Sequence, residues 1–128
     1  MIMKFVRYVF LVAPALLGQC EGIFLDETAN GSTIQTVPGH VIAIALHSTY
    51  WQIDGSSDLS VVAQDTEPTT TPAPPGTCLP GVGCGVVLVS FTALQPGTAS
   101  VSASRTLCGE ALACRPDQRT FSVTVIVQ

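Results

Sequence analysis

The sequence predicts an all-β fold in which two antiparallel sheets pack face to face as a sandwich. Three observations lead to this class. Apolar residues recur at every second position in several short runs, glycine and proline separate these runs, and no helical periodicity follows residue 20. The 128 residues suffice for about one domain, and a hydrophobic content of 47% excludes general disorder. We therefore expect one hydrophobic core.

The N-terminal segment, residues 1–19, has the pattern of a signal peptide. Lys4 and Arg7 precede the apolar run YVFLVAPALLG, which is too short to cross a bilayer as a helix of the mature protein. We therefore expect export, which would make the protein secreted, periplasmic or membrane-anchored at the outer face of the cell.

The end of this segment, LLGQC, resembles the lipobox of bacterial lipoproteins, in which a cysteine is lipidated and becomes the new N-terminus. Leu17 and Gly18 fit that pattern, whereas Gln19 stands where a small residue is usual. Two outcomes stay open, namely a lipid anchor on Cys20 or ordinary cleavage near this point. The mature domain is then residues 20–128.

The first half of the mature domain contains three predicted strands. GIFL at 22–25 and STIQTV at 32–37 are joined by the turn DETANG, and PGH leads into HVIAIAL at 40–46. In HVIAIAL every second residue is a large apolar one, so one side of this strand should face the core. These residues are Ile42, Ile44 and Leu46.

The second half continues the pattern. Further strands are predicted in DLSVVAQ (58–64), GVVLVSFTAL (85–94), ASVSAS (99–104) and TFSVTVIVQ (120–128), with another strand beginning at Trp51. In all, about seven to eight short strands favour an immunoglobulin-like antiparallel β-sandwich, with a small closed barrel as the alternative.

The segment DTEPTTTPAPPGT, residues 65–77, interrupts the strands with four prolines and repeated threonine. Proline has no backbone N–H and the segment has no apolar face, so we expect an exposed loop within the domain. It is either a passive spacer or an exposed polyproline II segment for a partner or for glycosylation. Asn30 also begins a glycosylation triplet, NGS, which has meaning only in a eukaryotic secretory host.

Four cysteines remain after Cys20, an even number that indicates disulfides in an exported protein. CLPGVGC and CGEALAC each contain two of them with five residues between, so two local disulfides are the simplest pairing. Pairing between the two loops stays open. A zinc site is the rival hypothesis, although zinc usually takes cysteines two to four residues apart. The residues concerned are Cys78, Cys84, Cys108 and Cys114.

The charge argues against nucleic-acid binding. Without residues 1–19 the chain keeps three arginines against nine acidic residues, which gives a net charge of −6. No clustered basic face is left to neutralise phosphates.

Signatures of catalysis or of cofactor binding are missing from the sequence. His40 and His47 have no Cys, Asp or Glu neighbour at metal-ligand spacing, and Ser48 beside His47 would point to the other face of a strand. Asp54 and Asp58 lie in DGSSD, where turn formation explains both. The glycines of GVGCG lack the lysine and the helix of a phosphate loop. We expect no enzyme, no metal and no cofactor.

Four stretches of the chain share one resemblance. ANGSTIQTVPGHVIAIAL, STYW, GVGCGVVLVSFTALQPGTASVSASR and TFSVTVIV, which cover most of residues 29–128, are similar to the chagasin-like family of cysteine-peptidase inhibitors. The resemblance implies an immunoglobulin-like sandwich whose loops after the second, fourth and sixth core strands meet at one end. In that family the loops enter the active-site cleft of papain-like peptidases, so such a peptidase is the implied partner.

The resemblance also implies which residues form the three loops. The family's first loop is an N-P-T-T-G-Y-x-W segment, its second loop is rich in glycine, and its third loop begins with Arg-Pro-aromatic. The matching positions here are Ser48, Thr49, Tyr50 and Trp51 in the first loop, Gly81, Val82, Gly83 and Gly85 in the second, and Arg105 in the third.

This chain departs from the family in each loop. The first loop lacks the Asn-Pro start and the glycine, and Cys84 occupies a glycine position in the second. In the third loop Thr106 and Leu107 follow the arginine, and the insert CGEALAC comes next. In immunoglobulin-like sandwiches a tryptophan at the position of Trp51 usually packs into the core, so we expect Trp51 in the core and Tyr50 at the rim.

Two hypotheses for function follow. In the first, an extracytoplasmic, non-enzymatic domain binds a protein partner through loops 47–51, 78–85 and 105–116 and inhibits a papain-like cysteine peptidase. In the second, the chain is a structural or adhesive cell-envelope lipoprotein module without inhibitory activity.

Overall fold

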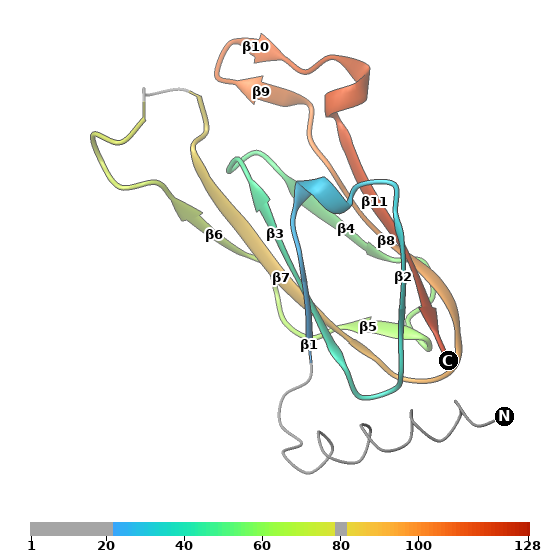
Figure 1. Ribbon diagram of the computed structural model, residues 1–128. Coiled ribbons are helices and arrows are strands. Elements are labelled where there is room, and N and C mark those ends of the chain that lie inside the picture. Colours follow the sequence, from blue (N-terminus) through green and yellow to red (C-terminus); the bar gives the residue numbers. More distant parts are fainter. Residues whose placement is uncertain (1–21, 79–81) are drawn as a thin grey trace, which may run out of the picture.

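A computed structural model describes residues 22–78 and 82–128 and shows an all-β molecule (Figure 1). The predictions for the signal segment 1–19, for Cys20 and for Gly81 lie outside the described residues. Two short 3-10 turns, η1 (Glu27–Ala29) and η2 (Pro116–Gln118), accompany the strands. The described strands are β1 (Gly22–Leu25), β2 (Thr33–Thr36), β3 (Val41–His47), β4 (Gln52–Ser56), β5 (Val62–Gln64), β6 (Thr69–Pro72), β7 (Gly85–Ala93), β8 (Gly97–Ser104), β9 (Leu107–Gly109), β10 (Leu112–Ala113) and β11 (Thr120–Val127).

Two sheets form the sandwich. One has the strand order β1-β3-β7-β5, with β6 also paired to β7, and the other has the order β2-β11-β8-β4. Strands β9 and β10 form a separate hairpin. The two sheets contain eight strands when β6 is left aside, so the predicted sandwich of seven to eight strands is confirmed. Among the described residues no helix is long and apolar enough to span a bilayer.

The edges of the sheets differ from the predicted antiparallel arrangement. Strand β1 runs parallel to β3, and β2 runs parallel to β11. The chain leaves β1 through η1 and enters β2 in the opposite sheet, so these two strands close the edges of different sheets and form no hairpin with each other. As a result η1 lies at the same end of the sandwich as the connection between β3 and β4 (Figure 1).

The core lies between the sheets and uses the predicted alternating residues. Each buried Val, Leu, Ile or Phe side chain contributes about 1.5–3 kcal/mol relative to exposure. Trp51, at 7% exposure, belongs to the same cluster, so its predicted place in the core is confirmed. The other predicted core residues, all buried, are Ile42, Ile44, Leu46, Val87, Val89, Phe91, Ala99, Val101, Ala103, Phe121, Val123, Val125 and Val127.

Two predictions in the residues that follow the first loop need correction. Strand β5 begins at Val62 and not at residue 58, because the Asp58 carboxylate accepts hydrogen bonds from the backbone N–H (3.0 Å) and hydroxyl (2.6 Å) of Ser60 and forms a turn. Asp54, predicted as a turn residue, lies instead in β4 at a register shift, where Ser104 Oγ donates to its carboxylate at 3.0 Å.

The Pro/Thr-rich segment 65–77 is exposed, as predicted, but it is not entirely a loop. Thr69–Pro72 forms β6 and pairs antiparallel with the start of β7. Pro72 is the last residue of that strand, where its missing N–H removes the least from the ladder. The next residue, Ala73, then donates its N–H to the carbonyl of Cys84 at 3.0 Å. The segment is thereby tied to the cysteine-bearing loop that precedes β7.

Candidate protein-binding tip

Three loops meet at one end of the sandwich. They are the first loop (48–51, between β3 and β4), the second loop (73–84, between β6 and β7) and the third loop (105–119, between β8 and β11), and we call them together the tip. Figure 1 shows them at the end that carries the β9–β10 hairpin. The turns after β2, β4 and β7 lie at the opposite end of the sandwich (Figure 1).

Backbone hydrogen bonds join the first loop to the second loop and to the start of β7. The N–H of Ser48 donates to the carbonyl of Gly85 at 2.9 Å, and the N–H of Thr49 donates to that of Gly83 at 2.8 Å. Gly83 has a φ of 69°, and a side chain there would collide with the Tyr50 ring, whose Cδ2 would lie 2.7 Å from the added carbon. Glycine at this position therefore allows the Tyr50 ring to rest against the backbone of the second loop.

Gly85 has a similar role at the start of β7. Its φ is 150°, and an added Cβ would collide with the Thr71 carbonyl oxygen and with Thr49 Cγ2. Gly83 and Gly85 were the positions of the second loop that best matched the family pattern. The structure gives a physical reason for glycine at both.

Ser48 holds the first loop in an unusual backbone conformation. Its φ is 124°, and it is the one residue other than glycine with a positive φ in the described part of the chain. Such a conformation costs roughly 1–3 kcal/mol and persists only where the surroundings enforce it. Here the bond to Gly85 holds the backbone, and the Ser48 hydroxyl accepts from the N–H of Tyr50 at 3.1 Å.

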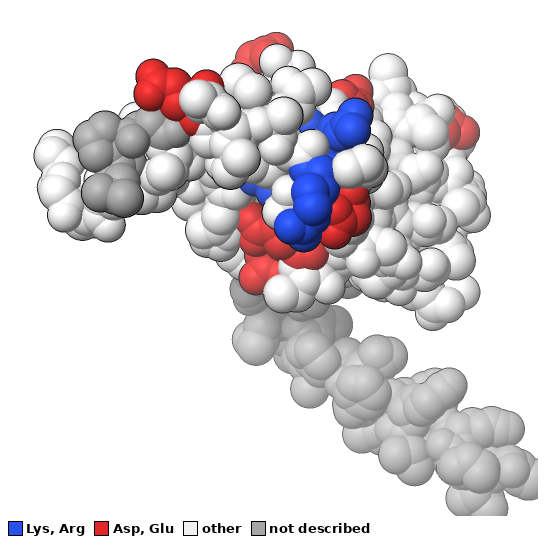
Figure 2. Space-filling model, turned by 90° about the horizontal axis from the view of Figure 1, so that it is seen from above, with Lys and Arg blue, Asp and Glu red and all other residues white. Residues whose placement is uncertain are grey.

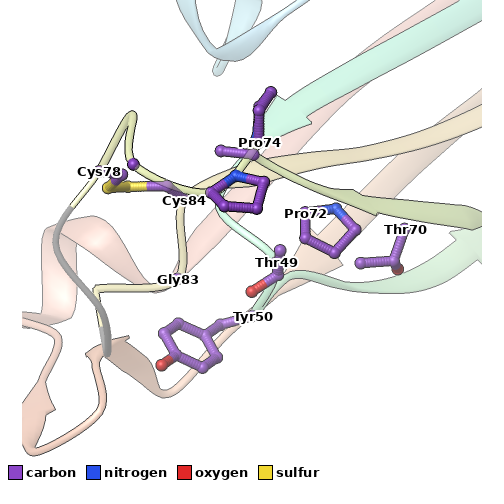
Figure 3. A pocket seen from close by; sticks show the side chains of 11 residues that line it. Thr49, Tyr50, Thr70, Pro72, Pro74, Cys78, Gly83 and Cys84 are labelled. Carbon is purple, nitrogen blue, oxygen red and sulfur yellow. A yellow bond between two sulfur atoms is a disulfide. The ribbon is translucent and has the colours of Figure 1, made fainter.

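An open hollow of about 570 Å³ lies between the first and second loops. Figure 3 shows the Tyr50 ring on one side, with Pro72, Pro74 and the Cys78–Cys84 disulfide on the other. The walls are mostly apolar, and several of the residues that form them are held by backbone hydrogen bonds or by the disulfide. The hollow is large enough to receive a side chain from another molecule.

The disulfides follow the simplest predicted pairing. Cys78 is bonded to Cys84 and Cys108 to Cys114, so each of the second and third loops is closed by its own disulfide. Closure of a loop of this length removes roughly 2–3 kcal/mol of chain entropy from the unfolded state. It also leaves a loop with less freedom to lose when a partner binds.

The third loop meets the first through Trp51. The Arg105 guanidinium lies over the Trp51 ring, with Cζ 4.4 Å from the ring centroid, and Arg105 Nε donates to the Gln118 carbonyl at 2.9 Å. Trp51 Nε1 donates to the carbonyl of His47 at 3.2 Å. Partial burial lowers the pKa of Arg105, and the charge of Glu27 acts in the opposite direction. Arg105 therefore covers the outer side of a core residue.

A pair of residues at the base of the first loop escaped the sequence analysis. His47 donates its backbone N–H to the Glu27 carboxylate, and its Nδ1 lies 2.9 Å from Glu27 Oε1. Partial burial acts to raise the pKa of Glu27, but hydrogen bonds from His47 hold it below its ordinary value, and the same pairing raises the pKa of His47. The two residues are twenty positions apart and no local spacing connects them, so only the fold reveals the pair.

The charges of the tip are unlike those of the rest of the domain. The three arginines of the described residues all belong to the third loop, and Figure 2, which looks onto this end, shows them close together beside acidic side chains. Arg115 pairs with Asp117, with Nε 3.2 Å from Oδ1. The end that carries the tip therefore presents both signs of charge, with all three arginines next to carboxylates.

The structure brings most of the predicted site residues together. All four first-loop positions contact the second or third loop or lie beside them, and Gly83, Gly85 and Arg105 are among their partners. Val82 is 40% exposed on the second loop. Among the described residues no three His, Cys, Asp or Glu side chains are grouped as metal ligands would be. The features of the tip are therefore its open hollow, the apolar walls of that hollow and its backbone hydrogen-bonding groups.

The comparisons with known proteins give a fold and no sequence family. No family model and no curated protein matches the chain. The crystal structure of the cysteine protease inhibitor EhICP2 from Entamoeba histolytica matches with a TM-score of 0.59 and 14% identity, over 86% of this chain and 98% of that one. The solution structure of amebosin matches with a TM-score of 0.57 and 23% identity, over 86% and 100%. The fold implied by the resemblance to chagasin-like inhibitors is thus confirmed.

Proposed function

We propose that this chain is an exported, non-enzymatic domain that inhibits a papain-like cysteine peptidase by placing the tip in its active-site cleft. One observation carries the proposal. Loops from three separate strand connections are fixed to one another by the Thr49–Gly83 hydrogen bond and the Trp51–Arg105 contact. The similarity of the fold to that of EhICP2, a cysteine protease inhibitor, supports it.

The mechanism would be exclusion without a covalent step. A tip made of three joined loops is a wedge that a cleft can enclose on both sides, and its apolar residues and backbone groups can pair with the walls of that cleft. Because the two disulfides and the hydrogen bonds of Ser48 and Thr49 fix the loops in advance, binding orders little of the chain. Substrate would be kept from the catalytic cysteine for as long as the tip remained bound.

Inhibition of papain by the exported, disulfide-bonded protein tests the proposal. We expect competitive inhibition at submicromolar concentration. Val82→Asp, on the second loop, should weaken it at least tenfold because a desolvated carboxylate would face the cleft. Leu94→Asp is the matched control, since Leu94 is also an exposed apolar loop residue (49% exposed) but lies at the opposite end of the sandwich.

Two results would contradict this function. One is a lack of inhibition at micromolar concentration by protein whose two disulfides have been mapped. The other is equal weakening by Val82→Asp and Leu94→Asp. Either would favour the structural or adhesive envelope module, in which the tip contacts no peptidase.

Export and the fate of Cys20 belong to the same proposal. Export through the N-terminal segment would bring the cysteines into an oxidising compartment, where the two disulfides can form. Mass spectrometry of the mature protein distinguishes the outcomes. A diacylglycerol-modified Cys20 at the new N-terminus supports a lipid anchor, an unmodified N-terminus near this point supports simple secretion, and an intact residue 1 contradicts export by cleavage.

A further inference from the structure

The turn between β1 and β2 forms part of the end that carries the tip. The Asp26 carboxylate caps η1 by accepting from the N–H of Thr28 at 2.9 Å. Asn30 Oδ1 accepts from the N–H of Ser122 at 2.8 Å, and the N–H of Gly31 donates to the Ser122 carbonyl at 2.8 Å. The turn is thus fastened to β11, and the position of the Glu27 side chain is set by the sandwich.

From this fixed position Glu27 holds the entrance of the first loop. Its carboxylate accepts the backbone N–H of His47 and contacts the imidazole, while the carbonyl of His47 accepts from Trp51 Nε1. His47 is the last residue of β3, so both of its peptide groups are tied immediately before the strained Ser48. Glu27 also lines a hollow of about 200 Å³ together with Trp51 and Arg105, which places it between the first and third loops.

We propose that Glu27 is a positioning residue of the tip, and that the affinity of the tip for its partner falls as His47 loses its proton. The positioning role of Glu27 concerns the chain alone. The dependence of affinity on the protonation of His47 rests on the proposed function.

The charges around His47 give the direction of the effect. On the η1 side it faces Glu27 and the more distant Asp26, and on β7 the opposite residue is Val86, which carries no charge. The charge of Glu27 also acts on Arg105 in the third loop. At pH values between the lowered pKa of Glu27 and the raised pKa of His47, the carboxylate is therefore negative and the imidazole is positive. Above that window the imidazole is neutral and the carboxylate holds the loop less firmly.

Nuclear magnetic resonance of the exported, oxidised protein tests the positioning role. We expect Glu27→Gln to lower the pKa of His47 and to speed amide exchange in the first loop roughly two- to fivefold, the range expected for an exposed ion pair. Glu67→Gln is the matched control, because it removes the same charge from the Pro/Thr-rich segment and should change neither quantity. If Glu27→Gln behaves like Glu67→Gln, the positioning role is overturned.

Papain inhibition between pH 5.5 and 8 tests the dependence on pH. The readout is the ratio of inhibition constants of Glu27→Gln and wild type, because titration of papain itself cancels in this ratio. We expect the ratio to be largest at low pH and to approach one above the pKa of His47. A ratio that does not vary with pH overturns the dependence of affinity on the protonation of His47. If the wild type does not inhibit papain at all, the proposed function fails, and the magnetic resonance measurements still decide the role of Glu27.

Discussion

Tyr50 and Trp51 are adjacent in the sequence, yet they connect the first loop to two different parts of the molecule. Tyr50 is half-buried, lies against the backbone of Gly83 and forms a wall of the open hollow. Trp51 is buried in the core, donates a hydrogen bond to the chain at the end of β3 and is covered by Arg105. Under the proposed function, the Trp51 side of the tip would serve stability and the Tyr50 side would serve recognition.

The two disulfides differ in the same way as Tyr50 and Trp51, since one lies beside the hollow and the other includes a buried cysteine. Cys78–Cys84 closes an exposed loop beside the hollow, where the Gly83 carbonyl accepts from Thr49 of the first loop and the Cys84 carbonyl accepts from Ala73, the residue after β6. Cys108–Cys114 closes the β9–β10 hairpin, where Cys114 is buried and donates its N–H to the Thr106 carbonyl at 3.0 Å. We therefore expect the second loop to affect binding more than stability, and the third loop to affect both.

The largest effect should come from the two aromatic residues themselves. Trp51→Ala should lower the free energy of unfolding by about 3–5 kcal/mol, because it leaves a cavity between the sheets. Tyr50→Ala should cost less than half as much and should still abolish most papain inhibition. Urea unfolding and an inhibition assay on the same samples measure both quantities. Equal losses of stability for the two variants would contradict the division of roles.

Removal of each disulfide sharpens the comparison. Both enclose loops of the same length, with a sequence separation of 6, so each loss should lower the free energy of unfolding by roughly 2–3 kcal/mol. Replacing Cys108 and Cys114 by alanine should cost more than replacing Cys78 and Cys84, because Cys114 is buried. Thermal unfolding gives the ranking. The reverse order would show that the second loop supports the fold more than the third does.

The sequence predicts those features of the molecule that follow from a regular local spacing of residues. Ile42, Ile44 and Leu46 are recognisable because burial on one face of a strand recurs at every second residue, and the local disulfides follow from equal spacing within two loops. The sequence analysis missed features that depend on a contact with residues far away in the sequence. Strand β6 forms because the start of β7 offers an unpaired edge, and Glu27 meets His47 only after η1 crosses between the sheets.

For the tip, the residues of the three loops could be predicted from the sequence, but the contacts between the loops could not. The resemblance to chagasin-like inhibitors pointed to Tyr50, Trp51 and Arg105. It gave no sign that Arg105 would lie over Trp51, because that contact joins loops more than fifty residues apart. The same limit applies to Asp54, whose carboxylate is explained by Ser104 on the neighbouring strand.

Gly83→Ala tests whether the Tyr50 side is recognition surface. Gly83 and Gly76 both have a positive φ, and alanine should cost each about 1–2 kcal/mol for that reason. Only at Gly83 would the new methyl group collide with Tyr50, whereas nothing lies within 4 Å at Gly76. We expect Gly83→Ala to weaken papain inhibition at least tenfold and Gly76→Ala to leave it nearly unchanged. Similar inhibition by both variants would show that the ring position is unimportant.

The smallest effect should come from the Glu27–His47 pair, which joins the base of the first loop to the Trp51 side. The side chains are 36% and 66% exposed, so the pair contributes only about 0.2–1 kcal/mol to the free energy of unfolding. Because the folded pKa of His47 is raised, its contribution is complete below the ordinary value of 6.5 and is lost as the pH rises through the raised value. Because the pKa of Glu27 is lowered, its contribution is present above its ordinary value and is lost as the pH falls through the lowered one.

The stabilising effect of the pair should therefore be greatest between these limits. We expect the stability difference between wild type and Glu27→Gln, from urea midpoints, to be larger at pH 5.5 than at pH 8.5. The same difference at both values would mean that Glu27 acts through its hydrogen bond to the backbone N–H of His47, which does not titrate. In that case the tip would keep its shape across this range, and only the charge that it presents to a partner would change with pH.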